Sequence, residues 1–359
     1  MKVVVVASHS GGHVCPAVAF CQGLRERESD TAITFITTDG EIERSLVDTA
    51  FHPLYYKREK LTVFTAYKLI ALFLNAKTLF QRLKPDVVAG FGGYLSIPFI
   101  LAAYYYKIPS FIHEQNVTLG SANRFLARFA NKIILSFPQS NGTIAHKEKT
   151  FVLGLPLRKE LKRADRQQAR HYFGFDAQQF ILLVVGGSQG SMRINTELVK
   201  ALKEIDSADI GIIHSTGFLD YERTLKEYKD IKMEKRVVPF IERMDYAMSA
   251  CDLMISRAGA GTIAEIIFMK TPALLIPYPH AKQHQLDNAR FLRNNNAALL
   301  MTEEGFDARV LKEKIIALKN NRRELAQLSA SLEMVPGSCA REKLAACAYG
   351  LKQWNGERV

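Results

Sequence analysis

The chain has 359 residues, of which 48% are hydrophobic and 23% charged, and this composition excludes disordered and collagen-like proteins. Its 48 Lys and Arg against 36 Asp and Glu give a net charge of +12, which favours a phosphorylated substrate or an acidic membrane surface as a partner. No RRM-like, KH-like or zinc-finger pattern is present, so no nucleic-acid partner is expected. The five cysteines form no C-x-x-C pair, which fits a reducing compartment without a disulfide framework or zinc ribbon.

Two apolar stretches could be mistaken for a signal peptide or a transmembrane helix. The apolar run at 3–7 is too short for a signal peptide. The uncharged stretch 87–106 has a spanning length, but it contains three glycines near its start and Pro98. We therefore expect no transmembrane helix.

Apolar strands alternate with helical segments along the chain. Strands are predicted at 3–7, 32–37, 87–89 and 110–113, and the first is followed by a glycine turn and a helix over 16–28. The pattern restarts with strands at 180–185, 210–214, 236–238, 253–256 and 273–277. Fully apolar strands separated by helices are typical of parallel sheets covered on both faces. The sequence thus predicts two doubly wound α/β domains, with a linker near 154–166 and an amphipathic helix over 340–354.

Three glycine loops follow predicted strands and precede predicted helices, at 10–13, 186–190 and 259–264. Glycines let the backbone approach a phosphate, and a helix N-terminus supplies free N–H groups. His13 at the start of its helix is a candidate base or phosphate donor; the alternative is an ordinary histidine in a tight turn. None of the loops is a Walker A sequence.

The third loop matches G-x-G-x-x-G/A, but the strand at 273–277 does not end in the acidic residue of a dinucleotide site. Mononucleotide binding is therefore favoured over NAD. Glu265 can accept hydrogen bonds from ribose hydroxyls, or it can simply complement the helix dipole.

Two polar clusters suit sugar hydroxyls: His113-Glu114-Gln115-Asn116, and the segment 280–288. A satisfied hydrogen-bond network and a solvated loop are the respective alternatives. No Asp-x-Asp and no metal-ligand spacing occurs, so neither a metal nor a cofactor is expected, and Arg158 or Arg257 are candidates to neutralise phosphate.

The segment 60–84 has apolar residues at helical spacing among lysines and arginines, with no acidic residue. This pattern is typical of a basic amphipathic helix on an anionic membrane, although a helix packed on the core would show the same periodicity. The expected membrane contacts are Leu69, Leu72, Phe73, Leu79 and Phe80.

Taken together, five motifs resemble the MurG family, the UDP-GlcNAc:undecaprenyl-diphosphate-MurNAc-pentapeptide N-acetylglucosaminyltransferases of bacterial peptidoglycan synthesis. They are Ser10-Gly11-Gly12-His13-Val14, Gly92-Gly93-Tyr94, His113-Glu114-Gln115-Asn116, Gly186-Gly187-Ser188-Gln189-Gly190 and the segment 257–265. They occur in the family's order and span nearly the whole chain. The resemblance implies a GT-B fold, in which two Rossmann-like doubly wound domains face a cleft. It also implies an inverting, metal-independent hexosyltransferase that moves GlcNAc from UDP-GlcNAc to the C4 hydroxyl of MurNAc in lipid I and forms lipid II.

The resemblance also implies roles for individual residues. His13 would be the catalytic base, and the acceptor diphosphate would lie against Ser10, Gly11, Gly12, Gly92, Gly93 and Tyr94. Glu265 would hold the ribose and Gln285 the GlcNAc hydroxyls. The full set of expected donor contacts is Ser10, Gly11, Gly12, Asn116, Arg158, Ser188, Ile241, Ala260, Gly261, Thr262, Ile263, Ala264, Glu265 and Gln285.

The implied organisation is an acceptor and membrane-facing domain over 1–156, a UDP-GlcNAc domain over 157–339, and a final helix over 340–359 that packs back on the first domain. The protein would be a peripheral enzyme at the cytoplasmic face of the bacterial plasma membrane, with other cell-wall enzymes as further partners. The sequence departs from the family at Ser8-His9-Ser10, Ala258 and His284. A transferase acting on another polyprenyl or diacylglycerol lipid is therefore the alternative, and a nicotinamide dehydrogenase or a non-catalytic sugar-nucleotide binder are the competitors from other classes.

Overall fold

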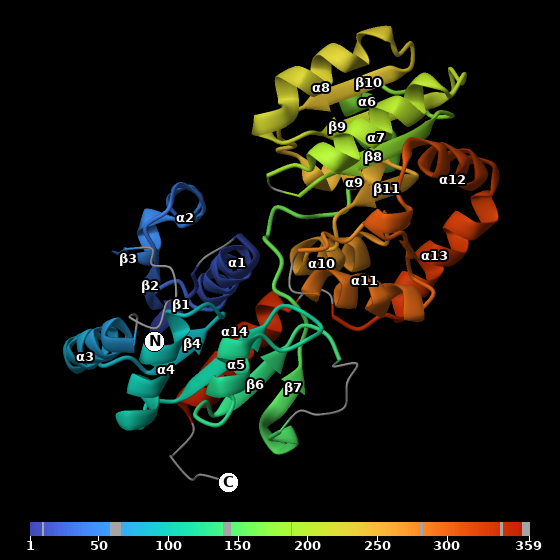
Figure 1. Cartoon of the computed structure of the whole chain (residues 1–359). Coiled ribbons are helices and arrows are strands. Elements are labelled where there is room, and N and C mark those ends of the chain that lie inside the picture. The colour runs from blue at the N-terminus through green and yellow to red at the C-terminus, as the bar shows by residue number, and fades with distance from the viewer. Residues whose placement is uncertain are drawn as a thin grey trace. The chain divides into compact units, whose positions relative to one another are not determined.

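The computed structural model describes residues 1–8, 11–57, 66–138, 145–187, 189–280, 283–337 and 340–353. The chain forms two compact units, shown in Figure 1. The first unit contains residues 1–159 and 336–359, and the second contains residues 160–335. The chain therefore leaves the first unit after residue 159 and returns to it for its last helix.

A seven-stranded parallel sheet forms the centre of the first unit, in the order β3-β2-β1-β4-β5-β6-β7. Its strands are β1 (Lys2–Val6), β2 (Ala32–Thr38), β3 (Pro53–Tyr56), β4 (Val87–Gly90), β5 (Ser110–Glu114), β6 (Lys132–Leu135) and β7 (Thr150–Val152). The strands β1, β4 and β5 are buried along nearly their whole length, which explains their continuous apolar sequences.

Helices cover both faces of this sheet. The helices α1 (Gly11–Arg27) and α14 (Arg341–Lys352) share one hydrophobic cluster with the strand side chains Val3, Val5 and Phe35. The opposite face, with Val4 and Val6, is covered by α3 (Ala66–Leu83), α4 (Ser96–Tyr105) and α5 (Ser121–Leu126), while α2 (Glu41–Leu46) follows β2. In Figure 1 the red α14 lies among the blue and green elements of the first unit, because its buried side chains complete the core beside α1.

The second unit repeats the architecture with a six-stranded parallel sheet in the order β10-β9-β8-β11-β12-β13. Its strands are β8 (Phe180–Val185), β9 (Ile210–Ser215), β10 (Glu234–Val238), β11 (Leu253–Ser256), β12 (Ala273–Leu275) and β13 (Leu299–Leu300). Its helices are α6 (Arg166–Phe173), α7 (Met192–Lys203), α8 (Tyr221–Glu227), α9 (Met244–Ala250), α10 (Ala260–Met269), α11 (His284–Asn294), α12 (Ala308–Asn320) and α13 (Arg322–Met334). Alternate residues of β8 pack with α7 and α12 in one cluster, and the others are equally buried on the opposite face.

The two parallel sheets confirm the predicted α/β class. Four of the observed strands were not predicted from the sequence. These are β3, β6, β7 and β13, which have four residues or fewer. The pairing of these segments with neighbouring strands defines them.

The helix α3 corrects one expectation about the 60–84 segment. Residues 58–65 lie outside the described residues, but α3 itself places Phe80 in the core at 2% exposure. The other expected membrane contacts, Leu69, Leu72, Phe73 and Leu79, are partly buried against the same cluster. The periodic apolar stripe is therefore the core-facing side, because a helix on a sheet must bury its widest apolar face.

None of the helices in the described ranges is both long enough and apolar enough to cross a bilayer. The uncharged stretch 87–106 contains the strand β4 and the helix α4, which has ten residues.

Candidate functional site

In the first unit, three loops meet at the carboxyl ends of neighbouring strands. The strand β1 leads toward α1, β4 leads into Phe91-Gly92-Gly93, and β5 leads into Gln115-Asn116. The strand order reverses between β1 and β4, and parallel α/β sheets bind ligands at such a point. The N-terminus of α1 has no acidic residue in its first turn, so its free N–H groups can bind an anion. Ser10, which precedes this helix, lies outside the described residues.

His13 is half-buried in the first turn of α1, and its ring orientation is set by the backbone. Its Nδ1 lies 2.9 Å from the carbonyl oxygen of Ser8, which can only accept, so Nδ1 carries the proton. Nε2 of the neutral ring is then an acceptor. A Cβ on residue 92 would stand 3.1 Å from this Nε2, so the imidazole lies directly beside the β4–α4 loop. The arrangement is that of a histidine prepared to accept a proton at Nε2.

The loop after β4 depends on its two glycines. Gly92 and Gly93 have φ angles of +90° and +78°, a region that other residues rarely adopt. A Cβ at Gly93 would also collide with the hydroxyl of Ser8, so the loop can approach β1 only without side chains. Tyr94 is buried, and its hydroxyl donates to the Lys57 carbonyl at 3.4 Å.

The cluster after β5 is mostly a network within the protein. Glu114 is 3% exposed, and its carboxylate accepts from Asn116, Gly120 and Asn123, with distances between 2.9 and 3.3 Å. His113 is fully buried and lies 3.1 Å from the Gly154 carbonyl through Nε2. Burial lowers the pKa of His113 to about 4, so its ring is neutral and structural at neutral pH. Of this cluster, Asn116 is only half-buried.

In the second unit, the sheet order reverses between β8 and β11, and the two remaining glycine loops follow these strands. Gly187 has a φ of +92° and Gly190 a φ of +77°; Ser188 lies outside the described residues. Gly190 and Gly217 approach each other backbone to backbone, so that a Cβ on either would overlap carbonyl oxygens of the other loop. Ser191 then caps α7 by accepting from the Ile194 N–H at 3.4 Å.

The loop after β11 opens the helix α10, whose first turn is also free of acidic residues. Ala260, Ile263 and Ala264 are buried, so any ligand contact from them has to come from the backbone. The remaining predicted residues of this helix, Gly261, Thr262 and Glu265, are half-buried. A free helix N-terminus followed one turn later by a carboxylate can hold a phosphate and a hydroxyl-bearing ribose together.

Gln285, in the first turn of α11, joins this loop to the one after β12. Its Oε1 accepts from the backbone N–H groups of Ala258 at 3.3 Å and Tyr278 at 2.9 Å. This fixes the side-chain orientation, so that Nε2 is the atom that can donate to a ligand. Ile241 is 5% exposed, beyond the end of β10, and Arg158 is exposed near the end of the first unit's main segment.

Arg257 was a candidate to neutralise phosphate, but its guanidinium makes hydrogen bonds and an ion pair within the protein. It donates to the Ile276 carbonyl at 3.1 Å and to Ser191 Oγ at 2.8 Å, and it forms an ion pair with Glu303. Its buried side chain therefore ties together the loops that follow β8, β11, β12 and β13.

The structure adds one network that the sequence analysis missed. The buried His214 lies 3.0 Å from Asn195 Oδ1, and Asn195 Nδ2 donates to the Thr216 carbonyl at 3.0 Å, next to Gly217. Burial lowers the pKa of His214 to about 3. Asn195 therefore holds the Thr216-Gly217 turn against the β8–α7 loop. The only sequence signal was the glycine after the strand at 210–214.

Predicted residues are thus brought together in two groups, one in each unit. His13, Gly92, Gly93 and Asn116 gather at the first sheet, while the second unit holds Ala260–Glu265 at the start of α10, Gln285 at the start of α11 and Ile241 beyond β10. Within the described ranges, no three His, Cys, Asp or Glu side chains are placed to hold a metal ion.

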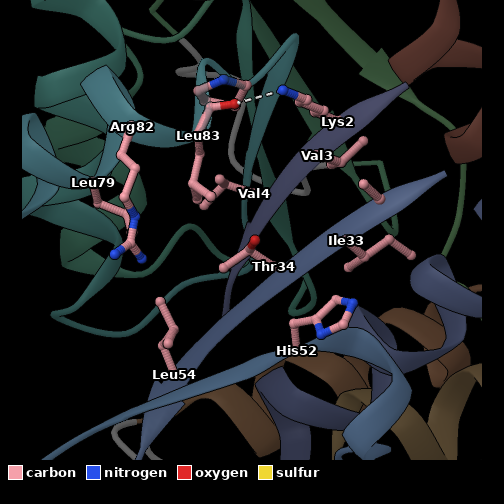
Figure 2. A pocket seen from close by; sticks show the side chains of 12 residues that line it. Lys2, Val3, Val4, Ile33, Thr34, His52, Leu54, Leu79, Arg82 and Leu83 are labelled. Carbon is pink, nitrogen blue, oxygen red and sulfur yellow. Dashed lines mark hydrogen bonds between the residues drawn. The ribbon is translucent and has the colours of Figure 1, made fainter.

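A cavity of about 360 Å³ lies elsewhere, at the amino-terminal ends of β1 and β2 (Figure 2). Leu54, Leu79 and Leu83 line it, together with Lys2, whose Nζ donates to the Leu83 carbonyl at 3.2 Å. It lies at the end of the sheet opposite the glycine loops and does not belong to the candidate site.

The chain matches two family models: the glycosyltransferase family 28 N-terminal domain over residues 3–135 and the C-terminal domain of the same family over residues 181–340. A protein of Desulforamulus reducens is 34% identical over 352 residues, covering 92% of this chain and 93% of that protein. A protein of Coxiella burnetii is 34% identical over 360 residues, covering 95% and 98%. Both are named UDP-N-acetylglucosamine–N-acetylmuramyl-(pentapeptide) pyrophosphoryl-undecaprenol N-acetylglucosamine transferase.

The crystal structure of Acinetobacter baumannii MurG superimposes with a TM-score of 0.79 at 29% identity, over 97% of this chain and 99% of that one. The two parallel α/β units thus form the GT-B type of glycosyltransferase fold. Since the similarity extends over both units, the chain belongs to glycosyltransferase family 28 and, within it, to the MurG family.

Proposed function

We propose that this protein transfers GlcNAc from UDP-GlcNAc to the C4 hydroxyl of MurNAc in lipid I and so forms lipid II. The observation that carries this proposal is the match, along nearly the full length, to relatives named for that reaction. The site chemistry agrees with it, since the first unit holds an imidazole whose Nε2 can accept a proton and the N-terminus of α10 in the second unit has no side-chain cap.

The reaction would be an inverting displacement without a metal. The C4 oxygen of MurNAc attacks the anomeric carbon of GlcNAc, a C–O bond forms, and the bond from that carbon to the UDP oxygen breaks. The proton of the C4 hydroxyl passes to His13 Nε2, and UDP leaves with the bonding electron pair. The N-terminus of α10 stabilises the negative charge that develops on the departing diphosphate.

Donor contacts would come mainly from the second unit. The carboxylate of Glu265 accepts hydrogen bonds from the ribose, and Gln285 Nε2 donates to a GlcNAc hydroxyl. Backbone N–H groups of 260–264 and of the loop containing Ser188 bind the diphosphate, with Ile241 beside the base. Asn116 and Arg158 would add contacts from the first unit.

The acceptor would bind at the first unit, with its diphosphate at the N-terminus of α1 and along Gly92 and Gly93. Ser10, Gly11 and Gly12 complete that site in the proposal. Tyr94 would support this site from beneath the loop and not through its hydroxyl, since the hydroxyl donates to the Lys57 carbonyl.

Membrane contact is proposed for the outer side of α3, in place of the core-facing residues. Tyr67, Ile70 and Leu74 are 63%, 61% and 54% exposed and lie on one side of the helix. Lys68 lies over the Tyr67 ring, and Lys77 lies 4.5 Å from the Tyr105 ring of α4. Exposed apolar side chains beside lysines suit an anionic bilayer, so the protein would work as a peripheral enzyme on the cytoplasmic face of the plasma membrane, alongside other cell-wall enzymes.

The test is transfer of labelled GlcNAc from UDP-GlcNAc to a short-chain lipid I analogue, with EDTA present. A β-1,4-linked disaccharide is the expected product, and its formation in EDTA would support a reaction without a metal. If the protein binds UDP-GlcNAc but yields no product, the acceptor assignment is wrong, and diacylglycerol and other polyprenyl acceptors become the next substrates.

A further inference from the structure

The cavity at the amino-terminal ends of β1 and β2 (Figure 2) arises where β3 is shorter than its neighbour. The strand β3 pairs with β2 from Phe35 to Thr38, so residues 32–34 of β2 extend beyond it. The last turns of α3, which ends at Leu83, form the other wall. A space of about 360 Å³ therefore remains between the start of β2 and the end of the helix.

The walls of this cavity are largely apolar. Val4 and Leu54 line it from the sheet, Leu79 and Leu83 line it from α3, and Pro85 lies beside them. A hydrocarbon chain placed against these walls is stabilised, because its apolar surface is removed from water. The volume is at the lower end of the range of small-molecule sites, about 300–1,000 Å³, and so suits one chain rather than two.

The polar side chains around the cavity are cations or hydrogen-bond donors. They are Lys2, Thr34, His52 and Arg82, and none of the described residues that line the cavity is acidic. Lys2, His52 and Arg82 are exposed, so a ligand can reach them from solvent. An ammonium has three N–H donors, and Lys2 gives one of them to the Leu83 carbonyl at 3.2 Å.

The nearby carboxylate of Asp86 does not line the cavity, because it is bound elsewhere. It accepts from the backbone N–H of Lys2 at 2.7 Å and lies 3.8 Å from Nζ of Lys352 in α14. The Lys2 ammonium and the Arg82 guanidinium thus give the cavity a positive rim. A guanidinium matches the two oxygens of a carboxylate, so this rim favours an anionic head group.

We propose that this cavity binds a single-chain anionic amphiphile of the fatty-acid class. Its hydrocarbon chain packs against Leu54, Leu79 and Leu83, and its carboxylate accepts hydrogen bonds from Arg82 and Lys2. The binding site lies at the end of the sheet opposite the glycine loops and does not depend on the proposed function.

The first test measures the binding of decanoate by calorimetry at neutral pH, below its micelle concentration. Ala32 is exposed and lines the cavity, so Ala32→Trp fills the space without replacing a core side chain. The wild type should bind decanoate, and Ala32→Trp should raise the Kd at least about tenfold, because the chain loses its apolar contacts. Ser29→Trp adds the same side chain at an exposed position outside the cavity and should bind as the wild type does.

The second test separates the charge of the head group from the chain. Decyl maltoside has the same chain without a charge and should bind the wild type about tenfold more weakly than decanoate. Arg82→Gln should raise the Kd for decanoate about tenfold and leave that for decyl maltoside unchanged. Arg124→Gln, which removes the same charge from an exposed position of α5, should bind decanoate normally.

Three results would overturn the inference: no binding of decanoate by the wild type, an unchanged Kd in Ala32→Trp, or equal affinities of the wild type for decanoate and decyl maltoside. Urea titration checks that each variant is folded, and Ala32→Phe takes the place of Ala32→Trp if the latter is not. Since binding is measured without any transfer reaction, a failure of the proposed function would leave these results unaffected.

Discussion

At the scale of residues, the site of the first unit depends on hydrogen bonds that fix the protonation of single side chains. The Ser8 carbonyl holds the proton on His13 Nδ1 and leaves Nε2 as an acceptor. Glu114 also lies at this end of the sheet, but its carboxylate already accepts from four N–H donors of the protein. His13 is therefore the residue whose loss should affect the chemistry.

His13→Ala should lower kcat by about 10²- to 10⁴-fold, the usual contribution of a positioned general base. The Kd for UDP-GlcNAc, measured by calorimetry, should stay unchanged because the proposed donor contacts come mainly from the other unit and do not include His13. His171→Ala, an exposed histidine on α6, is the matched control and should keep full activity. If kcat of His13→Ala equals that of the wild type, another group accepts the proton.

Glu265→Gln should raise the Kd for UDP-GlcNAc about tenfold, because hydrogen bonds to an ionised group are stronger than those to a neutral amide. The exposed Glu222→Gln on α8 removes the same charge from the second unit and should bind normally. An equal Kd for both variants would assign Glu265 to the helix dipole alone.

At the scale of elements, α3 shows how one helix can serve a core and a surface. Its apolar stripe, with Ala76 and Phe80, packs on the sheet. The other side presents Tyr67, Ile70 and Leu74 to solvent. Periodicity identified the stripe but could not distinguish the core from a bilayer, since both are apolar environments.

Replacing both Ile70 and Leu74 by Asp should reduce binding to anionic vesicles at least about tenfold in co-sedimentation, since it removes apolar contact and adds repulsion. The free energy of unfolding should change little, because both side chains are mostly exposed. The control replaces Asn75 and Thr78 by Asp, which adds the same charge at exposed polar positions of α3. If both pairs of changes release the protein equally, charge alone governs the binding.

At the scale of the whole molecule, among the residues that the structure describes, each unit buries one histidine fully, His113 in the first and His214 in the second. Burial lowers the pKa of His113 to about 4 and that of His214 to about 3, against 6.5 for an exposed histidine. Above pH 6.5, the folded and unfolded states are both neutral at these positions. As the pH falls below 6.5, the unfolded chain binds protons that the folded chain cannot, so both units lose stability.

The free energy of unfolding should therefore fall between pH 6.5 and about 4, by up to about 1.4 kcal/mol per pH unit for each histidine. Urea titrations at pH 7, 6 and 5 measure this slope. His214→Asn should be less stable at pH 7 but show a smaller decrease on acidification, whereas the exposed His171→Ala should follow the wild type. A slope unchanged by His214→Asn would contradict this origin of the acid sensitivity.

The class of the fold and the positions of the glycine loops could be predicted because they depend on local patterns. Buried parallel strands require continuous apolar runs such as 180–185, and a turn that approaches a ligand or another strand requires glycine at positions such as 92. The strand at 150–152 has no such pattern, since its pairing with β6 alone defines it. The motifs also carried the family resemblance, because they lie at the ends of these regular elements.

What only the tertiary structure decided is which atoms meet. The sequence shows His13, Gly92 and Gln115 far apart, and only the adjacent ends of β1, β4 and β5 bring them to one place. The core-facing side of α3, the occupied guanidinium of Arg257 and the cavity beside α3 likewise follow from contacts between distant segments. Local sequence determines the conformation of a strand, turn or helix, whereas hydrogen-bond satisfaction and burial depend on every neighbour that the fold supplies.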